Sequence, residues 1–186
     1  ARSISSNFNS LVDPFYMLAH GDLCPDNILL RYDKSQKHIE QLYFVDYSRS
    51  GIRNIFYDVT FMRMTFPTCW CIEKLPTNFV KAFERAYKSR WDTAISPSQF
   101  GSQITKWSLY HVITTIADLM PRVWETDLIL SGYSLRQRIV DRIRAYLTIF
   151  SDPELLGSDK KSYSASKEQL EGLLLILYDI WPQTKA

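Results

Sequence analysis

The sequence predicts a mainly α-helical fold with one small β-hairpin near its amino-terminal end, which is an α+β class. Short apolar runs separated by polar turns dominate residues 15–66, a pattern typical of strands and loops. Beyond this segment, apolar residues recur at the three- and four-residue spacing of helices. We therefore expect an irregular lead-in over residues 1–14 and one domain over residues 15–186, in which residues 67–186 form a helical subdomain.

The predicted hairpin consists of two β-rich runs, Ile28–Tyr32 and Ile39–Val45, joined by the polar turn Asp33–Lys37. The short apolar run Phe15–Ala19 precedes the loop that leads into the hairpin. The lead-in, Ala1–Pro14, is polar, rich in Ser and Asn, and without periodicity, so no regular structure is expected there.

Four apolar stripes at helical spacing follow the hairpin. They contain Phe79, Val80, Phe83, Tyr87 and Trp91; Ile104, Trp107, Val112, Ile113, Ile116 and Met120; Leu135, Ile139, Ile143, Leu147 and Phe150; and Leu170, Leu173, Leu174, Leu177 and Trp181. Thr77 is a candidate N-cap of the first helix, and Ser166 with Gln169 forms a candidate capping box before the fourth. The second stripe surrounds much of its helix, which indicates burial. In the third helix, Arg136, Arg138, Arg142 and Arg144 are expected on the solvated face, with a binding patch as the alternative.

The amino-acid composition argues against several classes of protein and partner. The chain is 46% hydrophobic and 23% charged, which is ordinary for a globular protein, and its net charge of +2 gives no electrostatic reason to expect nucleic acid or a membrane surface as a partner. Three cysteines, an odd number, argue against a disulfide framework and for a reducing compartment. No apolar run approaches the ~18 residues of a membrane span. We therefore expect a cytoplasmic protein.

The segment His20–Asn27, together with Asp46, carries the strongest chemical signal. Asp22 and Asn27 have the five-residue separation found in kinase catalytic loops, where an Asp orients the substrate hydroxyl and an Asn holds a metal ion. The hairpin brings Asn27, before its first strand, close to Asp46, after its second. Two hard oxygen ligands at one place suit Mg²⁺. The alternative is that Asp22 and Asn27 only cap a turn.

The segments His20–Leu30 and Phe44–Val59 resemble the phosphotransferase family that includes aminoglycoside phosphotransferases and choline or ethanolamine kinases. That family's loop, His-Gly-Asp-Leu, three variable residues and Asn-Ile-Leu, is matched from His20 to Leu29. Its second motif is matched by Phe44-Val45-Asp46-Tyr47 and by Tyr57-Asp58-Val59. The resemblance implies a protein-kinase-like fold.

The resemblance also implies roles for individual residues. Asp22 would be the catalytic base or the carboxylate that orients the hydroxyl. Asn27 and Asp46 would bind magnesium. His20 would be a structural residue that steadies the loop, and Asp58 would bond to the loop backbone. Arg49 and Arg53 follow Asp46 and are candidates for phosphate contact, with a solvated loop as the alternative.

The function implied is transfer of the γ-phosphoryl group of ATP, with Mg²⁺, to a hydroxyl of an aminoglycoside-, choline- or sugar-like small molecule. Such kinases hold ATP with an amino-terminal lobe of roughly a hundred residues, whereas only nineteen residues precede His20 here. We therefore expect the carboxy-terminal lobe of a kinase-like fold, with the amino-terminal lobe of the same protein as its missing partner. The alternative is a non-catalytic binding or regulatory module, or an inactive truncated relative.

Overall fold

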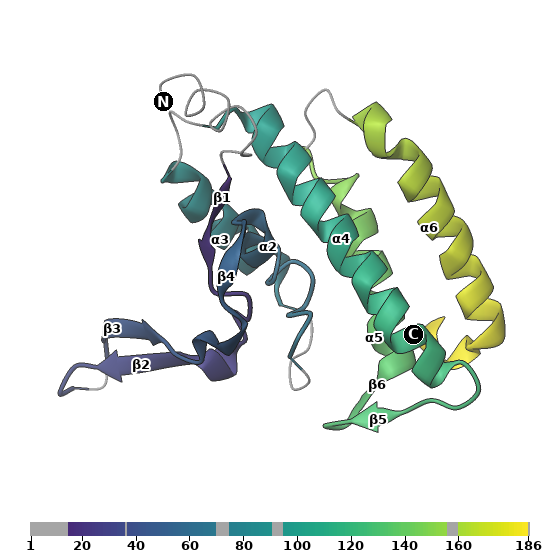
Figure 1. Ribbon diagram of the computed structural model, residues 1–186, viewed down its shortest axis with the longest axis horizontal. Coiled ribbons are helices and arrows are strands. Elements are labelled where there is room, and N and C mark those ends of the chain that lie inside the picture. The colour runs from purple at the N-terminus through teal and green to yellow at the C-terminus, as the bar shows by residue number, and fades with distance from the viewer. Residues whose placement is uncertain (1–14, 36, 70–74, 91–94, 156–159, 186) are drawn as a thin grey trace, which may run out of the picture. The chain divides into compact units, whose positions relative to one another are not determined.

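The computed structural model describes residues 15–35, 37–69, 75–90, 95–155 and 160–185 (Figure 1). The chain divides into two compact units, residues 1–58 and 59–186, which are described separately. The predicted lead-in over residues 1–14 lies outside the described residues, and so does Trp91 of the first predicted helical stripe.

The first unit is built from two antiparallel strand pairs. Strand β2 (Ile28–Tyr32) pairs with β3 (Ile39–Phe44), which confirms the predicted hairpin. Strand β1 (Tyr16–Ala19) pairs with β4 (Gly51–Asn54), a pairing that the sequence did not predict. A short helix, α2 (Phe56–Val59), begins at the end of this unit.

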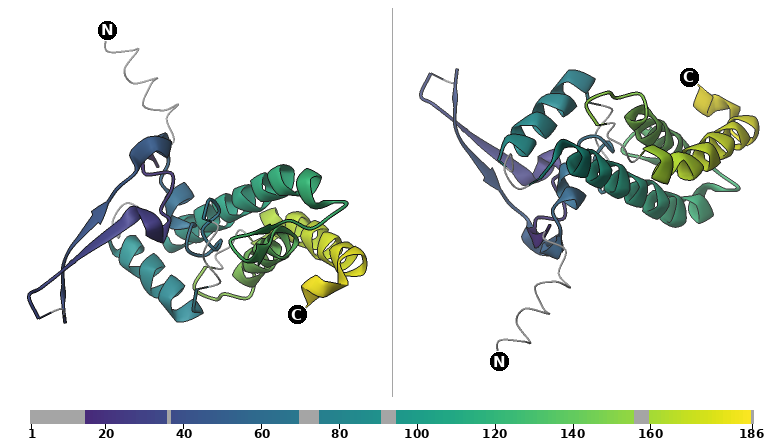
Figure 2. Two further views of the ribbon diagram at one scale, coloured as in Figure 1. Left: turned by 90° about the horizontal axis from the view of Figure 1, so that it is seen from below. Right: turned by 90° about the horizontal axis from the view of Figure 1, so that it is seen from above.

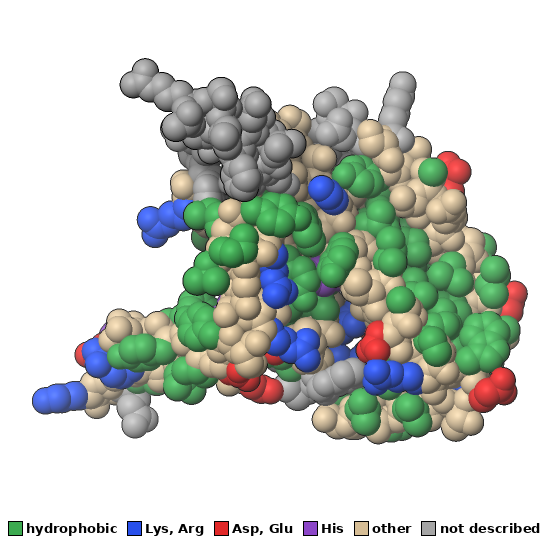
Figure 3. Space-filling model, viewed as in Figure 1, with side chains coloured by type: hydrophobic (Ala, Val, Ile, Leu, Met, Phe, Trp, Pro, Cys, Tyr) green, Lys and Arg blue, Asp and Glu red, His purple; other side chains and the backbone are tan. Residues whose placement is uncertain are grey.

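The β2–β3 hairpin is exposed on both faces. Leu30, Leu42 and Tyr43 each expose 40% or more of their surface, and Figure 3 shows apolar side chains along this part of the chain. The β1–β4 pair is better anchored, because Phe15 and Phe56 contact edge to face with ring centroids 5.5 Å apart. The buried end of the first unit therefore lies at β1, β4 and α2.

The second unit is helical, which confirms the predicted class. Its long helices are α3 (Thr77–Ser89), α4 (Pro97–Val123), α5 (Leu135–Ile149) and α6 (Lys160–Ile180). Helix α5 packs against both α4 and α6, and the three helices stay side by side in the further views of Figure 2. Among the described residues, no helix combines the length and apolarity that crossing a bilayer requires.

Short elements complete this unit. Strands β5 (Ile129–Leu130) and β6 (Tyr133–Ser134) form the turn between α4 and α5, and the 3₁₀ helix η3 (Pro182–Lys185) follows α6.

The core of the second unit lies between α4, α5 and α6. Ile104, Val112, Ile139, Ile143 and Leu177 are fully buried. Their burial follows from the apolar spacing of these helices.

The amino-terminal end of α4 is fixed by two local features. Ser96 and Gln99 form a reciprocal capping box, with Pro97 as the first helical residue. Gly101 allows a close approach, because a Cβ atom there would lie 2.0 Å from the carbonyl oxygen of Leu155.

Two predicted helix starts are wrong. Helix α6 begins at Lys160, so Ser166 and Gln169 lie inside the helix and form no capping box. The sequence from Lys160 to Gln169 contains neither Pro nor Gly, and nothing in it stops the helix from extending toward the amino terminus. Helix α3 begins at Thr77 itself, with Pro76 at the N-cap position and no side-chain cap.

The predictions from helical spacing were also wrong about the solvent exposure of some side chains. Ile113 is 55% exposed, so α4 is not buried around its whole circumference. Arg138 and Arg142 were expected in solvent, but they are 8% and 4% exposed. The correction has a physical reason, because both guanidinium groups bond to backbone carbonyls of residues 66–69, a segment distant in sequence.

A buried ion-pair network ties α3 to the end of α5. Arg63 donates two hydrogen bonds to the carboxylate of Glu84, at 2.7 and 2.6 Å, and its Nη2 lies 3.3 Å from Asp152. Lys81 donates to the other oxygen of Asp152 at 3.1 Å. The side chains of Arg63, Glu84 and Asp152 are each 6% exposed. Burial alone would raise the pKa of Asp152, but Lys81, the backbone N–H of Glu154 and Arg63 hold that pKa below its ordinary value.

Replacing Asp152 with Asn removes the charge that Arg63 and Lys81 share. We expect the free energy of unfolding at pH 7 to fall by about 3 kcal/mol, since breaking a buried ion pair leaves the partner charge uncompensated. Because the folded-state pKa of Asp152 lies below 3.8, its contribution is present above that pH and is lost as the pH falls through the folded-state pKa. Urea unfolding of both proteins between pH 7 and about pH 3 measures the difference.

Asp118→Asn is the matched control. Asp118 pairs with Arg122 on the surface of α4, with both side chains more than half exposed, so its loss should change stability by less than ~1 kcal/mol. An Asp152→Asn effect as small as that of the control, or one that stays constant down to about pH 3, would contradict the assigned role of the network.

Candidate active site

The hairpin register brings two loops of the first unit together. The His20 loop (residues 20–27) joins β1 to β2, and the Asp46 loop (residues 45–50) joins β3 to β4. Ile28 is paired with Phe44 at the end of the hairpin, and the backbone N–H of Val45 donates to the carbonyl of Asn27 at 2.9 Å. Asn27 and Asp46 therefore flank the same end of the hairpin.

Asp58, on α2, holds the start of the His20 loop. One of its carboxylate oxygens accepts a hydrogen bond from the backbone N–H of His20 at 2.7 Å, and the other accepts from that of Gly21 at 2.9 Å. Burial raises the pKa of Asp58, while these two N–H groups favour its charged form and oppose the shift. The carboxylate thus fixes two consecutive peptide groups.

The ring of His20 connects the two loops. Its Nδ1 accepts a hydrogen bond from the backbone N–H of Asp22 at 3.3 Å, and its Nε2 lies 3.0 Å from the carbonyl oxygen of Val45. A carbonyl can only accept, so the proton is on Nε2 and the ring is assigned as that tautomer. The rings of Tyr47 and Phe44 lie 4.7 and 5.9 Å from it. His20 is therefore a buried connector between the loops.

Gly21 is required by the geometry of the loop. Its φ is +80°, and a Cβ atom there would lie 2.3 Å from the carbonyl oxygen of Arg49. Arg53 donates to the same carbonyl at 2.7 Å. The close approach of Gly21 to Arg49 brings the His20 and Asp46 loops into contact.

Asp22 and Asn27 are oriented by short-range contacts. The side-chain amide of Asn27 donates to the backbone carbonyl of Asp22 at 3.0 Å, which fixes which end of the amide carries the oxygen. The carboxylate of Asp22 is 17% exposed, and its Oδ2 lies 3.7 Å from Nε of Arg49. The arrangement presents one carboxylate and one amide oxygen from the same loop.

Asp46 has a left-handed backbone conformation, with φ 57° and ψ 71°, which few residues other than Gly adopt. Its Oδ1 accepts from the backbone N–H of Ser48 at 3.2 Å. Hydrogen bonds from the side chain and backbone of Ser48 lower the pKa of Asp46, and the charge of Arg49 lowers it further. Asp46 is therefore an exposed carboxylate that is ionised at neutral pH.

Asn27 and Asp46 carry the kind of oxygen ligand that Mg²⁺ prefers, and magnesium binding by these two residues stays a prediction. Mg²⁺ is usually bound through one or two carboxylates plus water and substrate phosphates, and not by a full cage of protein ligands. The part of the chain that the structure describes holds no group of three or more His, Cys, Asp or Glu side chains that could bind a metal.

Arg49 and Arg53 both contact this site. Arg49 lies beside Asp22, while the guanidinium of Arg53 lies over the ring of Tyr57, 4.8 Å from its centroid. Phosphate contact by either residue stays a prediction. Sequence reasoning missed Ser48 and the contact between the rings of Tyr47 and His20, because no spacing rule identifies contacts made by residues of irregular loops.

The comparison with known proteins found a matching protein family for part of the chain. Residues 2–93, just under half of the chain, match the family model of the ecdysteroid kinase-like family. The matched segment includes the His20 loop, the Asp46 loop and Asp58, so this part of the chain is similar to kinase-like phosphotransferases. The search of curated proteins found no match.

Replacing Gly21 with Ala should displace the His20 loop. The new Cβ would collide with the backbone of Arg49 in a conformation that Ala rarely adopts, so we expect the free energy of unfolding to fall by more than ~2 kcal/mol. Gly172→Ala is the control, because a Cβ at this position in α6 meets no atom within 4 Å. Ala should stabilise that helix by up to ~1 kcal/mol. Equal effects of the two substitutions in urea unfolding would contradict the loop geometry.

Proposed function

We propose that this chain carries the catalytic loop and the metal ligands of a phosphotransferase that moves the γ-phosphoryl group of ATP to a hydroxyl of a small molecule. The observation that carries this proposal is the pairing of the two loops at one end of the hairpin, with His20 bonded to both. Asp22, Asn27 and Asp46 thereby occupy neighbouring loops. The similarity of residues 2–93 to kinase-like proteins supports it.

In this proposal Asp22 acts on the acceptor. Its carboxylate accepts a hydrogen bond from the substrate hydroxyl and takes its proton as the oxygen bonds to the γ-phosphorus. The bond from that phosphorus to the bridging oxygen breaks in line, and ADP leaves with the electron pair. The bond from Asn27 to the carbonyl of Asp22 keeps the loop in one conformation during this step.

Asn27 and Asp46 would hold Mg²⁺ through their side-chain oxygens. The ion, when bound, supplies positive charge that stabilises the phosphate oxygens. The low pKa of Asp46 keeps its carboxylate charged at neutral pH. Arg49, beside Asp22, would add a guanidinium near the transferred group. These are electrostatic and positioning roles, which account for most of the catalysis in phosphoryl transfer.

The acceptor is a small-molecule alcohol in this proposal. The name of the matching family suggests an ecdysteroid hydroxyl, and the motif resemblance suggests aminoglycoside-, choline- or sugar-like acceptors. The same resemblance assigns the remaining ATP contacts to an amino-terminal lobe of the same protein, and a cytoplasmic location fits the reaction.

Calorimetric titration of the chain with ATP, with and without Mg²⁺, tests the metal site. We expect Mg²⁺-dependent binding that Asp46→Ala weakens by about tenfold or more, since removing a charged ligand loses a large electrostatic contribution. Asp33→Ala is the control, because Asp33 is also an exposed carboxylate bonded to a Ser two residues later. It should bind within about twofold of the unmodified chain.

Asp22→Asn separates binding from chemistry. It should keep Mg²⁺-dependent ATP binding but lower phosphoryl transfer to a screened alcohol by about a hundredfold or more. Binding of ATP that is indifferent to Mg²⁺, or to the loss of Asp46, would contradict the proposal. Absence of ATP binding by the unmodified chain would mean either that the amino-terminal lobe is required for binding or that the site is vestigial.

A further inference from the structure

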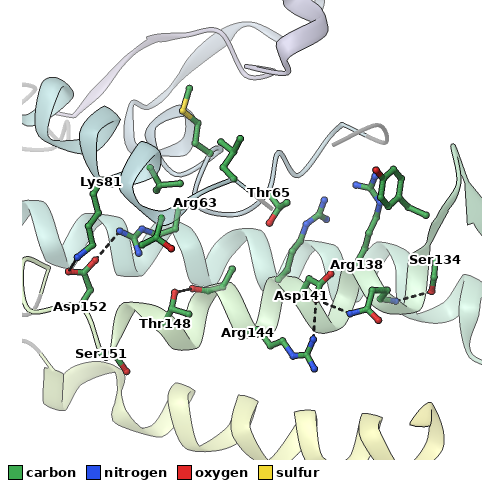
Figure 4. A pocket seen from close by; sticks show the side chains of 18 residues that line it. Arg63, Thr65, Lys81, Ser134, Arg138, Asp141, Arg144, Thr148, Ser151 and Asp152 are labelled. Atoms are coloured by element: carbon green, nitrogen blue, oxygen red, sulfur yellow. Dashed lines mark hydrogen bonds and ion pairs between the residues drawn. The ribbon is translucent and has the colours of Figure 1, made fainter. Parts of the chain in front are cut away.

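The helical unit contains a cavity of about 650 Å³, within the size range of small-molecule sites. Helix α5 supplies one wall, and α3 and the segment around residue 65 supply the other (Figure 4). Figure 4 shows Arg138 extending from α5 toward the side on which Thr65 lies. Every lining residue belongs to residues 59–186, so the cavity can be considered within this unit alone.

Positive charge predominates around this cavity. Five lining residues are cationic, namely Arg63, Lys81, Arg138, Arg142 and Arg144, and two are anionic, namely Asp141 and Asp152. At one end, Asp152 pairs with Arg63 and Lys81. At another, Asp141 lies 3.4 Å from Arg144. The carboxylates of Asp152 and Asp141 thus pair with cations other than Arg142.

Arg142 carries a buried positive charge. It is 4% exposed and donates to Thr115 Oγ1 at 2.6 Å and to the carbonyls of Pro67 and Phe66 at 2.9 and 3.5 Å. These acceptors are neutral oxygens, which satisfy hydrogen bonds without balancing the charge. Burial, with the charge of Arg138, lowers the pKa of Arg142 to about 10.

Arg138 adds a second positive charge four residues earlier on α5. It is 8% exposed, bonds to the carbonyl of Cys69 and lies 5.7 Å from the ring centroid of Tyr133. Like charges at this helical spacing repel each other, and burial strengthens the repulsion. An anion beside the two guanidinium groups would relieve it, and guanidinium groups bind carboxylate and phosphate with matching geometry.

The rest of the lining is partly apolar. Met62, Leu75 and Val80 line the cavity together with Ala145. A ligand that matches both features has one oxyanion group and an apolar body.

We propose that this cavity binds an organic anion, whose carboxylate or phosphate group lies beside Arg142 and Arg138 and whose apolar body contacts Met62, Leu75 and Val80. The site does not depend on the proposed phosphoryl transfer, because none of its residues belongs to the His20 or Asp46 loop. A purely structural role for Arg142, joining α5 to residues 66–67, would give no preference for an anionic ligand.

The first experiment uses ligands and leaves the chain unmodified. Calorimetry compares naphthalene-2-carboxylate with its neutral amide, 2-naphthamide, which has nearly the same shape. We expect the carboxylate to bind about tenfold or more tightly, since the charged group meets two buried guanidinium groups. 2-Naphthyl phosphate forms a third arm, and the tighter of the two anions identifies the preferred group. Equal affinities for the carboxylate, the phosphate and the amide, or no binding of any, would overturn the proposal.

The second experiment uses three variants. Arg142→Gln removes the central charge, and Ala145→Phe fills the cavity while leaving every charge in place. Both should weaken binding of the preferred anion by about tenfold or more, and Arg122→Gln, on the surface of α4, should change it less than about twofold.

Ala145→Phe keeps the test decisive if Arg142→Gln fails to fold. Anion binding that Ala145→Phe leaves unchanged would overturn the assignment to this cavity. Asp46→Ala should bind the naphthyl anions as the unmodified chain does, which separates this proposal from the proposed function.

Discussion

The carboxylate of Asp58 accepts hydrogen bonds from two consecutive backbone N–H groups, those of His20 and Gly21, and the geometry of the candidate active site depends on this contact. It holds Gly21 in a left-handed conformation against the carbonyl of Arg49. It also orients the ring of His20, which then bonds to the backbone of both loops. The candidate site residues are thus positioned by the half-buried carboxylate of Asp58 and the ring of His20.

The helical unit buries several charged side chains. Its apolar core lies between α4, α5 and α6, while four charged side chains around Arg63 and Asp152 neutralise one another at the end of α5. Arg142 is different, because its acceptors are neutral oxygens. Within one cavity, the charged side chains around Asp152 pair with one another and stabilise the fold, whereas the positive charge of Arg142 is available to a ligand.

Much of the candidate site could be predicted because its residues lie in two short segments joined by a regular hairpin. Two β-rich runs joined by a polar turn predicted the pairing of Ile28–Tyr32 with the following strand, and so the placement of Asn27 and Asp46 at the same end of the hairpin. Contacts over long separations could not be predicted in this way. Arg63 and Asp152 are 89 residues apart, and the burial of Arg142 depends on carbonyls from a distant loop. The spacing of apolar residues indicates which face of a helix is buried, but it does not identify the segment of the chain that packs on that helix.

We propose that Asn27 and Asp46 form one cation site at the end of the hairpin. Manganese, a paramagnetic substitute for Mg²⁺, tests it most directly when titrated into the isotope-labelled chain with ATP present, because each backbone amide signal weakens according to its distance from the ion. We expect the signals of Asn27 and Asp46 to weaken together at the lowest manganese concentrations, while that of Asp33, roughly 20 Å from Asn27 along β2, weakens later. Loss of only one of the two signals, or equal loss at Asp33, would contradict it.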